Sequence, residues 1–205
     1  MQFIYIHGFN SSFDFTSQKL LDLSTLFHVH GVNYDSFAAH REILIQLIEG
    51  IPPDIEMSEV VFAGTSLGGY WAAEMGKRFC RPSVIINPCL FPHIALQKPV
   101  GIEVMNYQTG EKKTLTKDAI RSYSEYSKHN GPTNITNKDA FSYLPLVLLD
   151  MGDDVINSYE TQRLLSEYPM TCFEGGSHRF NHMKRALSYI KEYVNHCSYV
   201  DQLGL

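Results

Sequence analysis

The chain has 205 residues, 44% of them hydrophobic and 19% charged, which fits a single globular domain, 1–205, with a sizeable core. Its 22 acidic and 17 basic residues give a formal net charge of −5, so we expect neither a nucleic-acid footprint nor a basic membrane patch. We therefore expect a small-molecule partner. No run approaches the roughly 18 apolar residues of a membrane span, no signal-peptide pattern is present, and the four cysteines lack metal-ligand spacing, which favours a cytoplasmic protein.

Alternating strand and helix patterns run through most of the chain. Apolar β-branched runs predict strands, and apolar residues at helical spacing predict helices. Strands are expected over 2–6, 29–34, 60–63, 83–87, 144–149 and 170–173, and helices over 16–27, 40–50, 159–168 and 181–197, with a further helix after residue 66. This alternation is typical of an α/β fold with a mostly parallel central sheet and helices on both faces.

A glycine-bracketed serine follows the third of these strands, in the stretch Gly64-Thr65-Ser66-Leu67-Gly68. Gly-x-Ser-x-Gly between a strand and a helix is the pattern of a nucleophile elbow, a tight turn that exposes a reactive hydroxyl. Ser66 is the predicted nucleophile. The alternative is a glycine-rich turn around a buried serine.

The first strand runs directly into the turn-rich loop that begins at His7-Gly8-Phe9. In an α/β-hydrolase, the N–H after the nucleophile and an N–H from an early loop form the oxyanion hole. We assign these donors to Leu67 and Phe9. His7 is expected to be structural.

A serine nucleophile needs a base and an acid that orients the base. His178 follows the last strand in a glycine loop, and Asp153 follows Gly152 at the spacing typical of an acid loop, which reproduces the order Ser, Asp, His. Asp154 is the alternative acid, and Asp150 either caps the loop or points to solvent. A two-histidine metal site at His178 and His182 has no third ligand indicated, so we expect no metal and no organic cofactor.

The segment from about 93 to 143 breaks the alternation. A structureless insert of this length is unusual, so we expect a small cap or lid with short helices, one of them over 116–126. A surface excursion without a role in substrate selection is the alternative. Because the insert carries tyrosines and polar groups, we expect a short pocket that prefers acyl chains of roughly two to six carbons.

Several motifs together resemble the small bacterial esterase family of the YqiA and YcfP type. They are 4–12, 64–72, Asn87-Pro88 with Leu90-Phe91-Pro92, 107–111, 152–155 and 175–180. The resemblance spans nearly the whole chain. It implies a compact α/β-hydrolase fold without the usual leading antiparallel hairpin, and an esterase activity. Some members of the family carry a degraded elbow, whereas this chain retains Ser66.

The residues and the resemblance jointly indicate a serine esterase acting on a small ester or thioester through an acyl-enzyme. Two alternatives stay open. One is a catalytically silent hydrolase fold that binds a ligand or a protein, and the other is a peptidase-type hydrolase with the same triad, because fold does not decide function. The natural substrate and the oligomeric state do not follow from the sequence.

Overall fold

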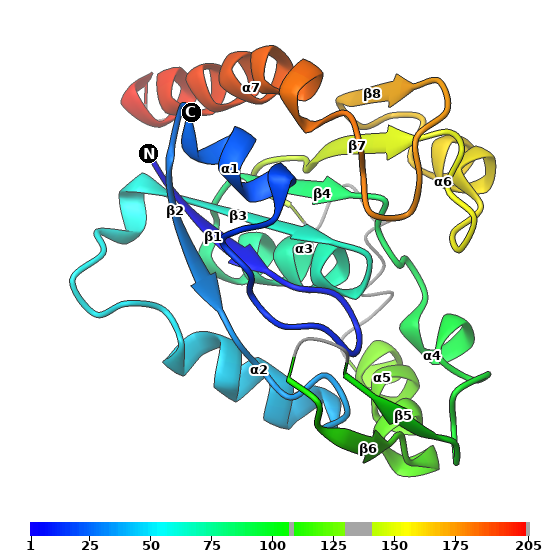
Figure 1. Cartoon of the computed structure of the whole chain (residues 1–205). Helices are drawn as coiled ribbons and strands as arrows, with labels where there is room; N and C mark the ends of the chain where they lie inside the picture. The colour runs from blue at the N-terminus through cyan, green and yellow to red at the C-terminus, as the bar shows by residue number, and fades with distance from the viewer. Residues whose placement is uncertain (107–108, 130–140, 204–205) are drawn as a thin grey trace.

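A computed structural model describes residues 1–106, 109–129 and 141–203. Its centre is a six-stranded sheet in the order β2-β1-β3-β4-β7-β8 (Figure 1). The strands are β1 (Gln2–Ile6), β2 (His28–Val32), β3 (Val60–Thr65), β4 (Ser83–Ile86), β7 (Leu146–Asp150) and β8 (Met170–Phe173). Every neighbouring pair in this sheet is parallel. The predicted α/β fold with a parallel sheet is confirmed. The first strand of the chain, β1, is itself part of this sheet.

Helices cover both faces of the sheet, because successive strand side chains point to opposite sides. Ile4, Phe62 and Val147 belong to one core cluster, which includes side chains of α2 and α3. Phe3 and Val61 belong to a second cluster, which includes side chains of α1 and α7. Figure 1 shows α1 and α7 on one side of the sheet and α2 and α3 on the other. Two apolar layers therefore hold the sheet, and its carboxyl edge carries the loops.

The helices that flank the sheet fall where the sequence pattern places them, with ends shifted by a few residues. They are α1 (Gln18–Ser24), α2 (His40–Glu49), α3 (Leu67–Phe79), α6 (Ser158–Leu164) and α7 (Met183–Leu203), with a short 3-10 turn at Met57–Glu59. The largest shift is at the carboxyl end of α7, which continues beyond the predicted end at 197. No helix in the described ranges combines the length and apolar character that crossing a membrane requires.

The insert begins with α4 (Pro92–Ala95), continues through an antiparallel pair, β5 (Glu103–Met105) and β6 (Lys112–Thr114), and then enters α5 (Lys117–His129). The helix predicted over 116–126 is present as α5, which packs against α2 and α4. The hairpin was not predicted, because its strands have three residues each and are mostly exposed. Residues 107–108 and 130–140 of the predicted insert lie outside the described part of the chain.

Candidate active site

Ser66 occupies the turn between β3 and α3 in a strained backbone conformation. Its φ of 58° and ψ of −122° are sparsely populated for a residue with a side chain. Glycine is required at both flanks: a Cβ on Gly64 would collide with the Gly68 backbone, and one on Gly68 would collide with the carbonyl of Ile6. The Ser66 N–H donates to the Ile86 carbonyl over 3.0 Å. The elbow is therefore held between β1, β4 and α3.

The loop after β1 lies directly beside this turn. An added Cβ at Gly8 would lie 3.5 Å from Ser66 Cβ, which places the Gly8-Phe9 peptide next to the serine. Among the described residues, neither the Phe9 N–H nor the Leu67 N–H donates a hydrogen bond, and Leu67 begins α3, where amides have no intrahelical acceptor. Both predicted oxyanion donors are thus free to bind a ligand oxygen.

His7 supports this loop through a hydrogen bond to its backbone. Its Nδ1 lies 2.8 Å from the Gly8 carbonyl, and its ring stacks on Tyr34 with 4.4 Å between centroids. Burial lowers the pKa of His7 from its ordinary value, so the ring stays neutral and keeps its proton on Nδ1. His7 contacts the protein backbone and not the serine hydroxyl.

His178 and Asp153 form a close pair. His178 Nδ1 lies 2.8 Å from Asp153 Oδ2 and 3.1 Å from Oδ1, and the Asp153 side chain has no exposed surface. Burial acts to raise the pKa of Asp153, but the hydrogen bonds from His178 and from the N–H groups of Ile156 and Val155 hold it below its ordinary value. The ionised carboxylate fixes the proton on Nδ1 and leaves Nε2 as the basic nitrogen. Asp154, the alternative acid, is exposed.

Asp150 is buried, so the alternative that it points to solvent is wrong, and its carboxylate contacts the loop of His178 and not the loop that Asp150 itself begins. Its Oδ2 accepts from the N–H groups of Ser177 and Asn181 over 3.1 and 2.7 Å, and its Oδ1 lies 2.7 Å from His182 Nδ1. Gly176 has a φ of 77°, and a Cβ there would collide with this carboxylate. Asp150 therefore anchors the loop that carries His178, a role that the sequence pattern did not reveal.

Asn87 holds the same loop from the neighbouring strand. Its Nδ2 donates to the carbonyls of Ser177 and His178 over 3.0 and 3.3 Å, while its Oδ1 accepts from the Asp150 N–H over 2.9 Å. Asn87 has a φ of 40°, a conformation that asparagine tolerates better than most residues. The only sign of this role in the sequence is an asparagine directly before Pro88. The role itself depends on Ser177 and His178, about 90 positions further along the chain.

Ser66 and His178 line the same pocket, of about 690 Å³, at the carboxyl ends of β1 and β3. Among the described residues no hydrogen bond joins Ser66 to His178, as is common before substrate tightens such a site. Most of the wall comes from the loop after β1 and the first turn of α1, and Asn106 is the residue that the described insert contributes. The pocket is thus built mainly by the amino-terminal third of the chain.

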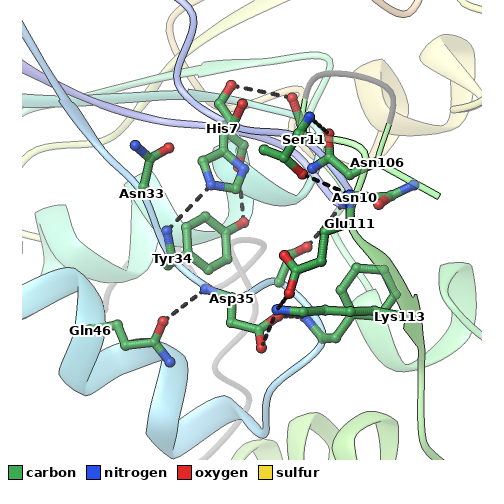
Figure 2. Close-up of a pocket in the computed structure, with 14 residues that line it drawn as sticks. His7, Asn10, Ser11, Asn33, Tyr34, Asp35, Gln46, Asn106, Glu111 and Lys113 are labelled. Carbon is green, nitrogen blue, oxygen red and sulfur yellow. Dashed lines mark hydrogen bonds and ion pairs between the residues drawn. The ribbon is translucent and has the colours of Figure 1, made fainter. Parts of the chain in front are cut away.

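A second pocket of about 350 Å³, lined mostly by residues with polar side chains, lies on the other side of the loop after β1 (Figure 2). Figure 2 shows Lys113 of β6 pointing at Asp35 and Glu111, with ion-pair distances of 3.0 and 3.2 Å. Asn10 lies in both walls, and its Nδ2 donates to the Met105 carbonyl over 3.2 Å. The hairpin of the insert therefore contacts the loop that carries Phe9.

His178 and His182 are close in sequence and raise the question of a metal site. In the part of the chain that the structure describes, no group of three or more His, Cys, Asp or Glu side chains is placed to hold a metal ion. His178 and His182 each pair with a different aspartate. The described side chains thus form two carboxylate–imidazole pairs.

A family model described as an uncharacterised protein family (UPF0227) matches residues 2–195. The chain belongs to the UPF0227 family. The UPF0227 protein YcfP of Escherichia coli O9:H4 (strain HS) is 24% identical over 195 residues, covering 93% of this chain and 97% of YcfP. The sequence resemblance to proteins of the YcfP type is confirmed.

Solved structures establish the fold of this UPF0227 chain. Est1E from Butyrivibrio proteoclasticus matches with a TM-score of 0.66 at 15% identity, covering 100% of this chain and 88% of Est1E. The alpha/beta hydrolase domain-containing protein 10 from mouse matches with a TM-score of 0.64 at 12% identity, covering 95% and 89% of the two chains. This member of the UPF0227 family therefore has the α/β-hydrolase fold.

Proposed function

We propose that this UPF0227 protein is a serine hydrolase that cleaves short-chain carboxylic esters, with Ser66 as nucleophile, His178 as base and Asp153 as the orienting acid. The observation that carries the proposal is the 2.8 Å contact between His178 Nδ1 and Asp153 Oδ2, with His178 lining the same pocket as Ser66. The hydrolase fold of the structural neighbours supports the same reaction class. The four cysteines are unpaired, which fits a cytoplasmic enzyme.

The reaction begins when His178 Nε2 removes the Ser66 hydroxyl proton as Oγ attacks the ester carbonyl. The carbonyl oxygen becomes an oxyanion, to which the Phe9 and Leu67 N–H groups donate. The Asp153 carboxylate stabilises the imidazolium that forms. Collapse of the tetrahedral intermediate passes the His178 proton to the alcohol and leaves an acyl-enzyme. Water, deprotonated by His178, then attacks the acyl-enzyme. As this second tetrahedral intermediate collapses, His178 returns the proton to Ser66 Oγ, which restores the serine and releases the acid.

The insert supports the loop that carries the proposed oxyanion donor Phe9. The hydrogen bond from Asn10 to the Met105 carbonyl connects the hairpin to the loop that carries Phe9. The Lys113–Asp35 ion pair connects the hairpin to the loop after β2, whose Ser36 Oγ accepts from the Asn10 N–H. A loop fixed from both sides keeps its N–H donor aimed at the developing charge, which lowers the reorganisation that the reaction requires. We propose that residues 93–143 form this cap within a single domain.

The decisive experiment is labelling with a fluorophosphonate, which reacts only with an activated serine. We expect the wild type to be labelled and to hydrolyse 4-nitrophenyl butyrate, and Ser66→Ala to lose both properties while it retains its far-UV circular dichroism. A catalytically silent binding protein would be neither labelled nor active. A peptidase would be labelled but would cleave peptide anilides faster than esters of matched acyl groups.

A further inference from the structure

Lys19 places a positive charge inside the proposed catalytic pocket. Its Nζ donates to Thr65 Oγ1 over 2.7 Å and to the Arg179 carbonyl over 3.2 Å. Thr65 directly precedes the nucleophile, and Arg179 directly follows His178. The ammonium therefore lies between the residues that flank the two catalytic side chains, and Lys19 lines the same pocket as they do.

The position of this ammonium is well defined. It lies 5.6 Å from the centroid of the Tyr5 ring, and Tyr5 is buried and hydrogen-bonded to Thr65 Oγ1 over 2.8 Å. A cation near an aromatic face and a fixed hydroxyl loses little further side-chain freedom when it binds an anion. Lys19 is thus ready to bind an anion before substrate arrives.

The charge of Lys19 is not neutralised by a neighbouring acid. Within 1–106, 109–129 and 141–203, no carboxylate forms an ion pair with it, and its two acceptors are neutral oxygens. Asp14 lines the same pocket, but its carboxylate accepts from the N–H and hydroxyl of Thr16 over 2.9 and 2.6 Å. The exposed Arg179 side chain adds a second cation to the wall. The ammonium has three donors, so one is available to a ligand in the pocket.

We propose that Lys19 binds a carboxylate group of the substrate, so that the enzyme prefers short esters that carry a carboxylate a few carbons from the scissile bond. This inference rests on the proposed ester hydrolase function. A charge-assisted hydrogen bond to a positioned ammonium favours a charged ester over a neutral ester of the same size. The expected preference in kcat/KM is about ten- to a hundredfold.

A purely structural role makes a different prediction. If Lys19 only joins α1 to the loops at Thr65 and Arg179, its loss disturbs the site equally for every substrate. The measurement must therefore compare charged and neutral esters within one variant. Lys191, an exposed residue of α7 outside the pocket, provides a matched control for loss of one lysine.

The test uses two pairs of substrates. The first is 4-nitrophenyl hemisuccinate and its neutral methyl ester, with the carboxylate on the acyl side. The second is 3-carboxyphenyl butyrate and its methyl ester, with the carboxylate on the alcohol side. For at least one pair, Lys19→Met should lower the charged-to-neutral ratio of kcat/KM by about tenfold or more. Lys19→Arg should restore part of the ratio, and Lys191→Met should leave it unchanged. Salt should lower the wild-type ratio but not that of Lys19→Met.

Several outcomes overturn the inference. Equal losses for both members of both pairs would assign Lys19 a structural role, and unchanged ratios would remove it from substrate binding. Either result, with Ser66-dependent cleavage of neutral esters intact, refutes only the inference about Lys19. If the wild type cleaves none of the four esters and Ser66 is not labelled, the proposed function itself fails.

Discussion

Replacing Asp153 with asparagine isolates the charge that orients His178. The side chain keeps its size, but an amide next to Nδ1 favours the wrong imidazole tautomer and no longer stabilises the imidazolium. At an effective dielectric constant of about 20, unit charges about 3 Å apart attract by roughly 5.5 kcal/mol, which corresponds to about 10⁴ in rate. The His178 side chain is 22% exposed, and water screens part of this attraction. We therefore expect Asp153→Asn to lower kcat/KM by about 10³- to 10⁴-fold.

The assay is the hydrolysis of 4-nitrophenyl butyrate, followed at substrate concentrations that give kcat and KM separately. We expect the loss in kcat, because the charge acts on the transition state. Asp154→Asn is the matched control, since Asp154 is the exposed neighbour in the same loop. It should keep kcat/KM within about threefold of the wild type, as surface substitutions usually do. The reasoning fails if Asp153→Asn keeps more than about a tenth of the activity or if Asp154→Asn loses as much.

Three further results are expected. Asp150→Asn should lower the free energy of unfolding in urea by about 2–3 kcal/mol, because three hydrogen-bond donors lose their carboxylate acceptor. It should also lower kcat/KM by about ten- to a hundredfold. Unchanged stability would argue against the anchoring role of Asp150. Burial lowers the pKa of His40 from 6.5 to about 3, so the unfolded chain takes up the proton first and stability falls with pH below 6.5. The loss of stability due to His40 reaches about 2 kcal/mol at pH 5. His40→Gln should remove that loss from the pH profile of the unfolding free energy. An unaltered slope would exclude His40 as the cause of the pH dependence. In a series of 4-nitrophenyl esters, kcat/KM should be highest for acyl chains of about two to six carbons, whereas a steady rise to long chains would refute a short pocket.

Local sequence patterns were sufficient to predict the parallel sheet with its flanking helices and the glycine-bracketed turn around Ser66. Glycines at 64 and 68 around Ser66 are required by close backbone approaches, so the pattern itself indicates the turn. The inner strands β3, β4 and β7 are buried on both faces and therefore appear as continuous apolar runs, which made the parallel sheet predictable. The hairpin β5–β6 could not be predicted in this way, because its short exposed strands bury little apolar surface and carry no periodic signal.

The tertiary structure separates three aspartates that are close in sequence, Asp150 at the end of β7 and Asp153 and Asp154 in the loop that follows. Asp150, Asp153 and Asp154 lie within five positions of one another and have the same chemistry, so the spacing after Gly152 favours Asp153 as the partner of His178 but leaves Asp154 as an alternative. The folded loop turns Asp153 toward His178, Asp150 toward the backbone of the same histidine loop, and Asp154 toward solvent.

Asn87 and Lys19 likewise acquire their roles only in the folded chain. Their partners at Ser177 and Arg179 are 90 and 160 residues away in the sequence. Local patterns report which backbone conformation and which burial a segment prefers. Contacts between distant loops depend on the packing of the whole sheet, because parallel strands bring their carboxyl ends to one edge whatever their separation along the chain.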